Sequence, residues 1–158
     1  MPMLELRVNG RDYRVLVEPT TTLLEVLREK LLIISPKVGC NTGDCGTCSV
    51  LLEDKLVRSC ITVALVAQGK EVTTVEGLAA PGELHPLQKA FHEHYGSQCG
   101  FCTPGMLLAA KALLDENPNP TEDEVKEAIA GNLCRCTGYV KIIESIRAAA
   151  AEMATAKA

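Results

Sequence analysis

The chain has 158 residues, of which 47% are hydrophobic and 23% charged, and a formal net charge of −4. This balance is typical of a globular protein with one or two small domains, and it gives no reason to expect binding to nucleic acid or to an anionic membrane. No stretch approaches the roughly 18 apolar residues of a membrane span, and the N-terminus lacks the apolar run of a signal peptide. We therefore expect a cytoplasmic protein, in which eight cysteines indicate metal or redox chemistry before disulfides.

The first part of the chain is predicted to be a hairpin, a helix and short strands. Apolar and polar residues alternate on both sides of Asn9-Gly10, a dipeptide that suits a type I′ turn. A capping box of Thr22 and Glu25, followed by a helical apolar period, predicts a helix over 22–32. A loop rich in Gly and Cys follows at 39–48, with strand-like runs at 49–53, 56–58 and 71–75. These elements predict a small α+β domain over residues 1–76.

The remainder, residues 77–158, is predicted to be a second and wholly helical domain. A linker at 77–86 has Pro81-Gly82 in its middle. Residues that typically begin and end helices then predict four helices in two consecutive pairs. The first covers 86–95, and the second runs from its cap Thr103 to about 117. The third runs from Thr121 to Gly131, and the fourth from about Thr137 into the Ala-rich tail. The last residues, 153–158, are expected to fray.

The eight cysteines fall into two groups of four, one in each predicted domain: Cys40, Cys45, Cys48 and Cys60, then Cys99, Cys102, Cys134 and Cys136. The first group has the C-x4-C-x2-C spacing, with a later fourth Cys, that is typical of plant-type [2Fe–2S] ferredoxins. The glycines at 39, 43 and 46 allow the backbone to curl and to direct N–H groups at sulfur, which an anionic cluster needs. The first group is therefore predicted to bind a [2Fe–2S] cluster.

In the second group, each pair of cysteines directly precedes a predicted helix. Two helix N-termini would then direct partial positive charge and free N–H groups at one anionic site. The spacing of C-x2-C with C-x-C is less common than the ferredoxin spacing. From the residues alone, an iron–sulfur cluster is the favoured interpretation of the second group, but the alternatives stay open.

Structural zinc is the main alternative for either group, since sites with four cysteine ligands are common for zinc. Disulfides are disfavoured because the chain has no export signal. Cys60 alone could also be a small core residue. His85, His92 and His94 are interpreted as a helix cap and two surface residues, because each group already has four cysteines.

The chain resembles the iron–sulfur subunit of the xanthine dehydrogenase, or molybdenum hydroxylase, family. The residues that carry the resemblance cover nearly the whole chain in order: Gly39-Cys40, Gly43 to Cys48, Gln98 to Met106, and Gly131 to Tyr139. The resemblance implies a plant-type ferredoxin-like β-grasp domain followed by a four-helix domain, both binding [2Fe–2S] clusters. It thereby favours iron–sulfur at the second group.

The resemblance also implies partners. The cluster of Cys99, Cys102, Cys134 and Cys136 would lie beside a molybdenum–pterin cofactor in a large subunit, with Gln98 bonded to the pterin and Cys136 near it. The other cluster would lie toward a medium, FAD-binding subunit, and the complex would be a dimer of heterotrimers. The chain would then be the electron-relaying subunit of an oxidoreductase, with no catalytic residue or substrate site of its own. The alternatives are a free-standing ferredoxin-like electron carrier and a zinc-stabilised interaction module.

Overall fold

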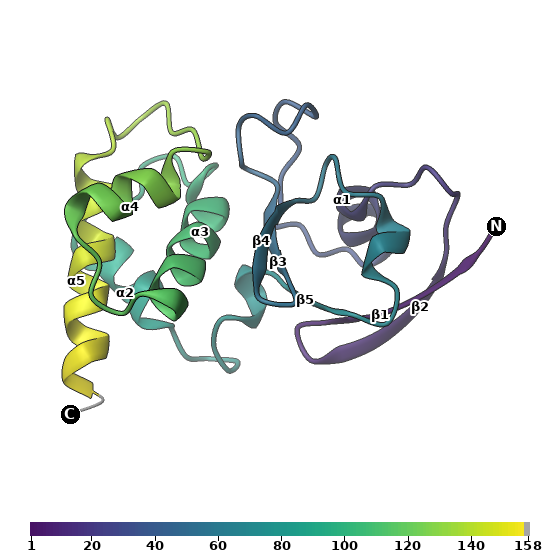
Figure 1. Cartoon of the computed structure of the whole chain (residues 1–158), viewed down its shortest axis with the longest axis horizontal. Helices are drawn as coiled ribbons and strands as arrows, with labels where there is room; N and C mark the ends of the chain where they lie inside the picture. The colour runs from purple at the N-terminus through teal and green to yellow at the C-terminus, as the bar shows by residue number, and fades with distance from the viewer. Residues whose placement is uncertain (157–158) are drawn as a thin grey trace.

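A computed structural model describes residues 1–156 of the chain. It has two lobes side by side, a mixed sheet at the N-terminal end and a group of helices at the C-terminal end (Figure 1). The sheet has the order β2-β1-β5-β3-β4. Its strands are β1 (Met3–Val8), β2 (Arg11–Leu16), β3 (Ser49–Leu52), β4 (Lys55–Arg58) and β5 (Glu71–Thr73). The pairing of β1 with β5 is parallel, and the other pairings are antiparallel.

The predicted N-terminal hairpin is confirmed. Asn9 and Gly10 both have positive φ, 51° and 78°, as the two central residues of a type I′ turn require. The Asn9 side chain also joins the turn to the chain after β5, because it donates to Thr74 Oγ1 at 2.8 Å and accepts from the Thr74 N–H at 2.9 Å. The turn therefore helps to hold β1 beside β5.

The helix predicted over 22–32 begins as expected but changes character. Thr22 and Glu25 form the predicted capping box, yet only α1 (Leu23–Glu25) is α-helical and a π-helical turn follows at Val26–Lys30. Arg28 donates to the carbonyl oxygens of Ile34 and Pro36, both at 2.8 Å, so its side chain holds the following segment against this turn. The wider turn keeps the apolar side chains of this segment in the core of the sheet lobe.

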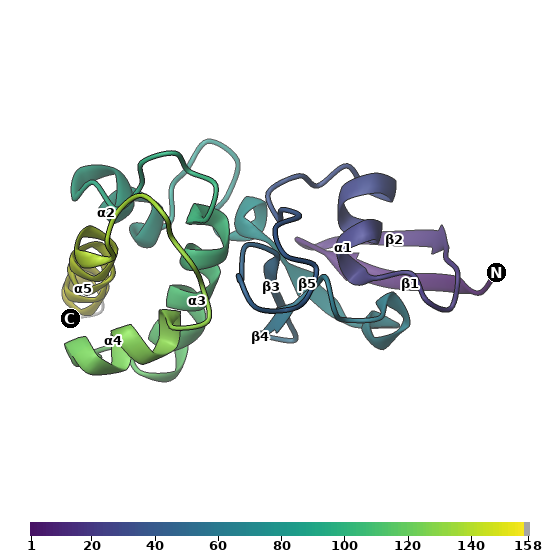
Figure 2. The same ribbon diagram turned by 90° about the horizontal axis from the view of Figure 1, so that it is seen from above.

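Four helices form the second lobe: α2 (Pro86–Glu93), α3 (Thr103–Glu116), α4 (Glu122–Ile129) and α5 (Val140–Ala156). Helix α2 packs along α5, and α3 packs on α4 around one apolar core. Helix α3 also packs against β3 and β4, so it is the element that faces the sheet (Figure 2). The predicted boundary between 76 and 77 falls in a short 3-10 turn (Val75–Gly77), and this division into domains stays a prediction.

Two predicted helix starts were wrong. Thr103 is the first residue of α3 rather than its cap, and Cys102 occupies the cap position. Helix α5 begins at Val140 instead of about Thr137, because Gly138 and Tyr139 have positive φ (63° and 69°) and interrupt the helical backbone. Of the tail that was expected to fray, residues 153–156 are helical and residues 157–158 lie outside the described residues.

Candidate metal centres

The structure brings the cysteines into the two predicted groups. All eight are free thiols, so no disulfide links any of them. Cys40, Cys45 and Cys48 lie on the loop between the π-helical turn and β3, and Cys60 lies just after β4. The Cys48 and Cys60 side chains are buried, in contact with Leu24, whereas Cys40 and Cys45 are half-buried.

The backbone around Cys40 favours its thiolate form. The N–H groups of Thr42 and Cys45 both donate to Cys40 Sγ at 3.4 Å. The Thr42 side chain, followed by these N–H groups, lowers the pKa of Cys40 to about 5. A thiolate is the form that binds metal, so this loop holds a ligand ready for a cation.

The rest of the first loop fits closely around sulfur. A Cβ at Gly39 would lie 2.7 Å from Cys45 Sγ and 2.8 Å from a methyl carbon of Thr47, so only glycine fits beside these side chains. Burial, and then the adjacent thiol of Cys48, raises the pKa of Cys60 to about 11. A bound metal ion would reverse that shift by stabilising the thiolate.

The second group comes from two loops of the helical lobe. Cys99 lies close to Cys136. The Phe101 N–H first, and the Cys136 thiol second, lower the pKa of Cys99. Cys102 lies close to Cys134: burial first and the Cys134 thiol second raise the pKa of Cys102 to about 12. The hydroxyl of Thr137 donates to Cys134 Sγ at 3.1 Å. The Thr137 side chain therefore belongs to the cysteine loop, which agrees with the start of α5 only at Val140.

Within each group, the thiols lie close enough to shift one another's pKa. In residues 1–156, no three His, Cys, Asp or Glu side chains are gathered in a way that could hold a metal ion. The pKa shifts nevertheless place Cys48 and Cys40 near Cys60, Cys136 and Cys134 near Cys99, and Cys134 and Cys99 near Cys102. A two-iron cluster takes four thiolates, two on each iron, whereas zinc gathers its ligands about 2.3 Å from one centre. This donor set fits [2Fe–2S] clusters.

The two groups differ in exposure. Cys99 and Cys136 are exposed, and Gln98 beside Cys99 is exposed as well. Exposed apolar side chains lie close to them in the sequence, at Phe101, Leu133 and Val140. The second group therefore has both exposed thiols and exposed apolar side chains among its near neighbours in the sequence.

The histidines are not part of either group. His85 is the cap of α2, as predicted, because its Nδ1 accepts the Leu87 N–H at 3.2 Å. His92 and His94 are exposed at the end of α2, which confirms their interpretation as surface residues.

Direct contacts between the cysteine loop of the sheet lobe and the two cysteine loops of the helical lobe were not predicted from the sequence. The Leu133 N–H donates to the Cys45 carbonyl oxygen at 2.9 Å, and Thr47 Oγ1 donates to the Phe101 carbonyl oxygen at 3.1 Å. Asn132 is buried and donates from Nδ2 to the Gly46 carbonyl oxygen at 3.0 Å. The only sequence signal was the position of Asn132, a polar residue that closely precedes a cysteine pair.

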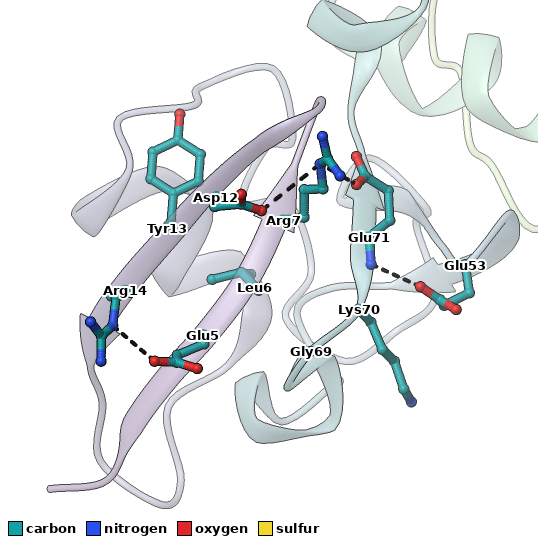
Figure 3. A pocket seen from close by; sticks show the side chains of 10 residues that line it. All are labelled: Glu5, Leu6, Arg7, Asp12, Tyr13, Arg14, Glu53, Gly69, Lys70 and Glu71. Carbon is teal, nitrogen blue, oxygen red and sulfur yellow. Dashed lines mark hydrogen bonds and ion pairs between the residues drawn. The ribbon is translucent and has the colours of Figure 1, made fainter.

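A groove of about 630 Å³ lies on the sheet, beside β1, β2 and β5 (Figure 3). Two ion pairs line it: Arg14 with Glu5 at 2.8 Å, and Arg7 with Glu71 at 3.4 Å. No cysteine lines it. The groove is thus a charged, solvated surface rather than a third metal centre.

Comparisons with known proteins agree with these two centres. Residues 6–79 match the family model described as a 2Fe-2S iron-sulfur cluster binding domain, and residues 74–147 match that of a [2Fe-2S] binding domain. The nicotine 6-hydroxylase small subunit of Paenarthrobacter nicotinovorans is 47% identical, over 90% of this chain and 86% of its own length. The chain belongs to the iron–sulfur subunits of the molybdenum hydroxylase family.

Other molybdenum hydroxylase relatives support the same membership. The aldehyde oxidoreductase iron-sulfur-binding subunit of Escherichia coli K12 is 42% identical, over 95% of this chain and 72% of the relative. A chain of quinoline 2-oxidoreductase from Pseudomonas putida 86 superposes with a TM-score of 0.93 at 42% identity, over 99% of this chain and 98% of the other. The aldehyde oxidoreductase of Desulfovibrio desulfuricans gives a TM-score of 0.95 at 47% identity, but this chain covers only 17% of it.

Membership of the family confirms the predicted fold class, a ferredoxin-like domain followed by a helical [2Fe–2S] domain, and the predicted identity as an oxidoreductase subunit. Helices capable of crossing a membrane are absent from the part of the chain that the structure describes. The assignment of individual cysteines as ligands, and of Gln98 and Cys136 to a pterin, stays a prediction.

Proposed function

We propose that this subunit holds two [2Fe–2S] clusters and relays electrons between a molybdenum centre in one partner subunit and a flavin in another. The ligands would be Cys40, Cys45, Cys48 and Cys60 for the cluster far from molybdenum, and Cys99, Cys102, Cys134 and Cys136 for the cluster near it. When bound, each cluster takes up and releases one electron at a time. The residues of this chain hold the clusters, direct N–H groups at their sulfurs and set the distance between them.

The observation that carries the proposal is the hydrogen bond from the Leu133 N–H to the Cys45 carbonyl oxygen, at 2.9 Å. Cys45 is a proposed ligand of one cluster, and Leu133 is the neighbour of Cys134, a proposed ligand of the other. The two ligand loops are thus in direct contact across the two lobes. An electron relay needs that proximity, whereas two unrelated structural metal sites do not.

The exposed end of the helical lobe supports a partner at the second site. Cys99 and Cys136 are exposed, and Phe101, Leu133 and Val140, close to them in the sequence, are exposed apolar residues. An apolar surface that includes cluster ligands is suited to burial against another subunit. We assign this surface to a large, molybdopterin-binding subunit, with Gln98 and Cys136 next to the pterin.

The sizes of the relatives support a separate large subunit. In the Desulfovibrio desulfuricans aldehyde oxidoreductase, the matching part is only 17% of one long chain. The Paenarthrobacter relative is named a small subunit. We infer that this chain works with a separate large subunit and a medium FAD-binding subunit, as a dimer of heterotrimers in the cytoplasm. The substrate would be bound by the large subunit.

Purification of the chain from its native source tests this proposal against a free-standing carrier. We expect the chain to co-elute in size exclusion with a molybdenum-containing subunit and a flavin-containing subunit in equal amounts. A lone chain of 16.9 kDa that carries both clusters would favour the carrier instead. A colourless chain that contains zinc would exclude both.

A further inference from the structure

We propose that Arg58 positions the two cluster sites relative to each other and that its charge favours the reduced form of both clusters. This inference rests on the proposed function, since it requires a cluster at each site. Arg58 is the last residue of β4, two residues before Cys60. Its guanidinium group reaches from the sheet lobe to the loop that precedes Cys134.

The guanidinium binds both lobes at once. Nη1 donates to Ser49 Oγ at 2.8 Å, and Ser49 directly follows Cys48. Nη2 donates to the Gly131 carbonyl oxygen at 2.7 Å and lies 3.4 Å from Asn132 Oδ1. One planar side chain therefore connects a residue next to a ligand of the first cluster with the segment that leads to Cys134.

A buried amide completes this connection. Asn132 is 1% exposed, and its Nδ2 donates to the Gly46 carbonyl oxygen at 3.0 Å and to Ser49 Oγ at 3.2 Å. Among the described residues, no buried side-chain nitrogen or oxygen lacks a hydrogen-bond partner. Loss of the guanidinium would remove a donor from both the Gly131 carbonyl and the Asn132 side chain, and burial makes such a loss costly.

The packing leaves this contact no room to shift. A Cβ at Gly131 would collide with Arg58 Nη2, and a Cβ at Gly46 would collide with the Gly131 carbonyl oxygen. A Cβ at Gly105, in the first turn of α3, would lie 2.5 Å from the Gly46 carbonyl oxygen. Because the backbones touch at three glycines, the hydrogen bonds of Arg58 fix one distance between the ligand loops.

The charge of Arg58 is not neutralised by this network. Its acceptors are a hydroxyl, a carbonyl and an amide, and within residues 1–156 it forms no ion pair with a carboxylate. An arginine stays protonated, and a half-buried charge is screened less than an exposed one. Each cluster becomes more negative on reduction, so a fixed positive charge between them favours both reduced forms.

Two substitutions separate geometry from charge. Arg58→Lys keeps the positive charge but loses the planar fork that bonds both lobes. Arg58→Gln loses the charge as well. Arg11→Gln serves as a matched control, since Arg11 is exposed at the start of β2, on the hairpin far from the cysteine loops in sequence. All three would be studied in the purified complex with its partner subunits.

The readouts are the magnetic interaction between the two reduced clusters, which depends steeply on their distance, and the reduction potential of each cluster. We expect both Arg58 variants to change the magnetic interaction. We expect only Arg58→Gln to lower the reduction potential of both clusters, by about 59 mV. For a one-electron couple this is a tenfold change in the equilibrium constant of reduction. Arg11→Gln should change neither property.

The outcomes separate the inference from the proposed function. Two intact clusters with wild-type interaction and potentials in Arg58→Gln would overturn the inference and leave the proposed function standing. A shift in only one cluster would also overturn the shared role. If Arg58→Gln does not assemble, an unchanged magnetic interaction in Arg58→Lys overturns the positioning role. Fewer than two clusters in the unmodified complex would instead disprove the proposed function.

Discussion

Leu133 and Cys45 are 88 positions apart in the chain, yet the N–H of the first donates a hydrogen bond of 2.9 Å to the carbonyl oxygen of the second. Cys45 belongs to the ferredoxin-like loop, and Leu133 precedes Cys134 in the helical lobe. One backbone hydrogen bond therefore connects the loops of the two predicted cluster sites directly. The contact between the ferredoxin-like loop and the Cys134 loop is therefore made within this chain.

The tight contact between the loops predicts a different cost for two otherwise similar glycine substitutions. Gly46 and Gly69 both have positive φ, +74° and +69°, but a Cβ at Gly46 would strike the Gly131 carbonyl whereas nothing lies within 4 Å of a Cβ at Gly69. We expect Gly69→Ala to lower the free energy of unfolding by about 1–2 kcal/mol, because of backbone strain. We expect Gly46→Ala to lower the free energy of unfolding by about 1–3 kcal/mol more, because of overpacking.

The measurement is the midpoint of thermal unfolding of the purified complex, together with the magnetic interaction of its clusters. Gly46→Ala should lower the midpoint further and change the interaction, while Gly69→Ala should leave the interaction as it is. Equal effects of the two substitutions would show that the loops are not in close contact.

Single ligand substitutions are predicted to act on one cluster each. Cys136 is exposed in the helical lobe and Cys48 is buried in the sheet lobe, and neither side chain takes part in the hydrogen bonds between the loops. We expect Cys136→Ser to remove or alter one set of paramagnetic signals and Cys48→Ser to affect the other set, as measured by electron paramagnetic resonance. If either substitution abolished both sets, the two sites would not be independent.

His85 is predicted to make the start of α2 sensitive to pH. Burial first, and then the charge of Lys111, lower the pKa of His85, and its neutral Nδ1 accepts the Leu87 N–H at 3.2 Å. Because the folded-state pKa lies below the usual value of about 6.5, the stabilisation is fully present above pH ~6.5. It is lost as the pH falls through the folded-state pKa, when the protonated ring can no longer accept.

Hydrogen exchange of the Leu87 amide, corrected for its intrinsic rate, measures this effect in the complex. Protection should decrease on acidification in the unmodified protein. His85→Asn keeps a side-chain acceptor at the cap without titrating in this range, so its protection should stay constant. The same loss of protection in both proteins would mean that His85 is not the titrating group.

Features that depend on neighbouring residues could be predicted from the sequence. The turn at Asn9-Gly10, the capping box of Thr22 and the helix start at Thr121 were predicted because each is marked by a local sequence pattern. The division of the cysteines into two groups also followed from spacing.

Features that depend on docking of distant segments could not be predicted. The π-helical turn is braced by Arg28, whose side chain reaches carbonyl groups beyond the helix. The late start of α5 reflects the bond from Thr137 to Cys134. The bonds of Arg58 to the segment around Gly131 span more than 70 positions, and no local pattern marks them.

The central claim is that the eight cysteines hold two separate [2Fe–2S] clusters. It is tested most directly by metal analysis and electron paramagnetic resonance on the complex, prepared without oxygen and then reduced. We predict a brown protein with about four irons for each copy of this chain and two distinct sets of paramagnetic signals. Zinc in place of iron, or a single set of signals from about two irons, would contradict the claim.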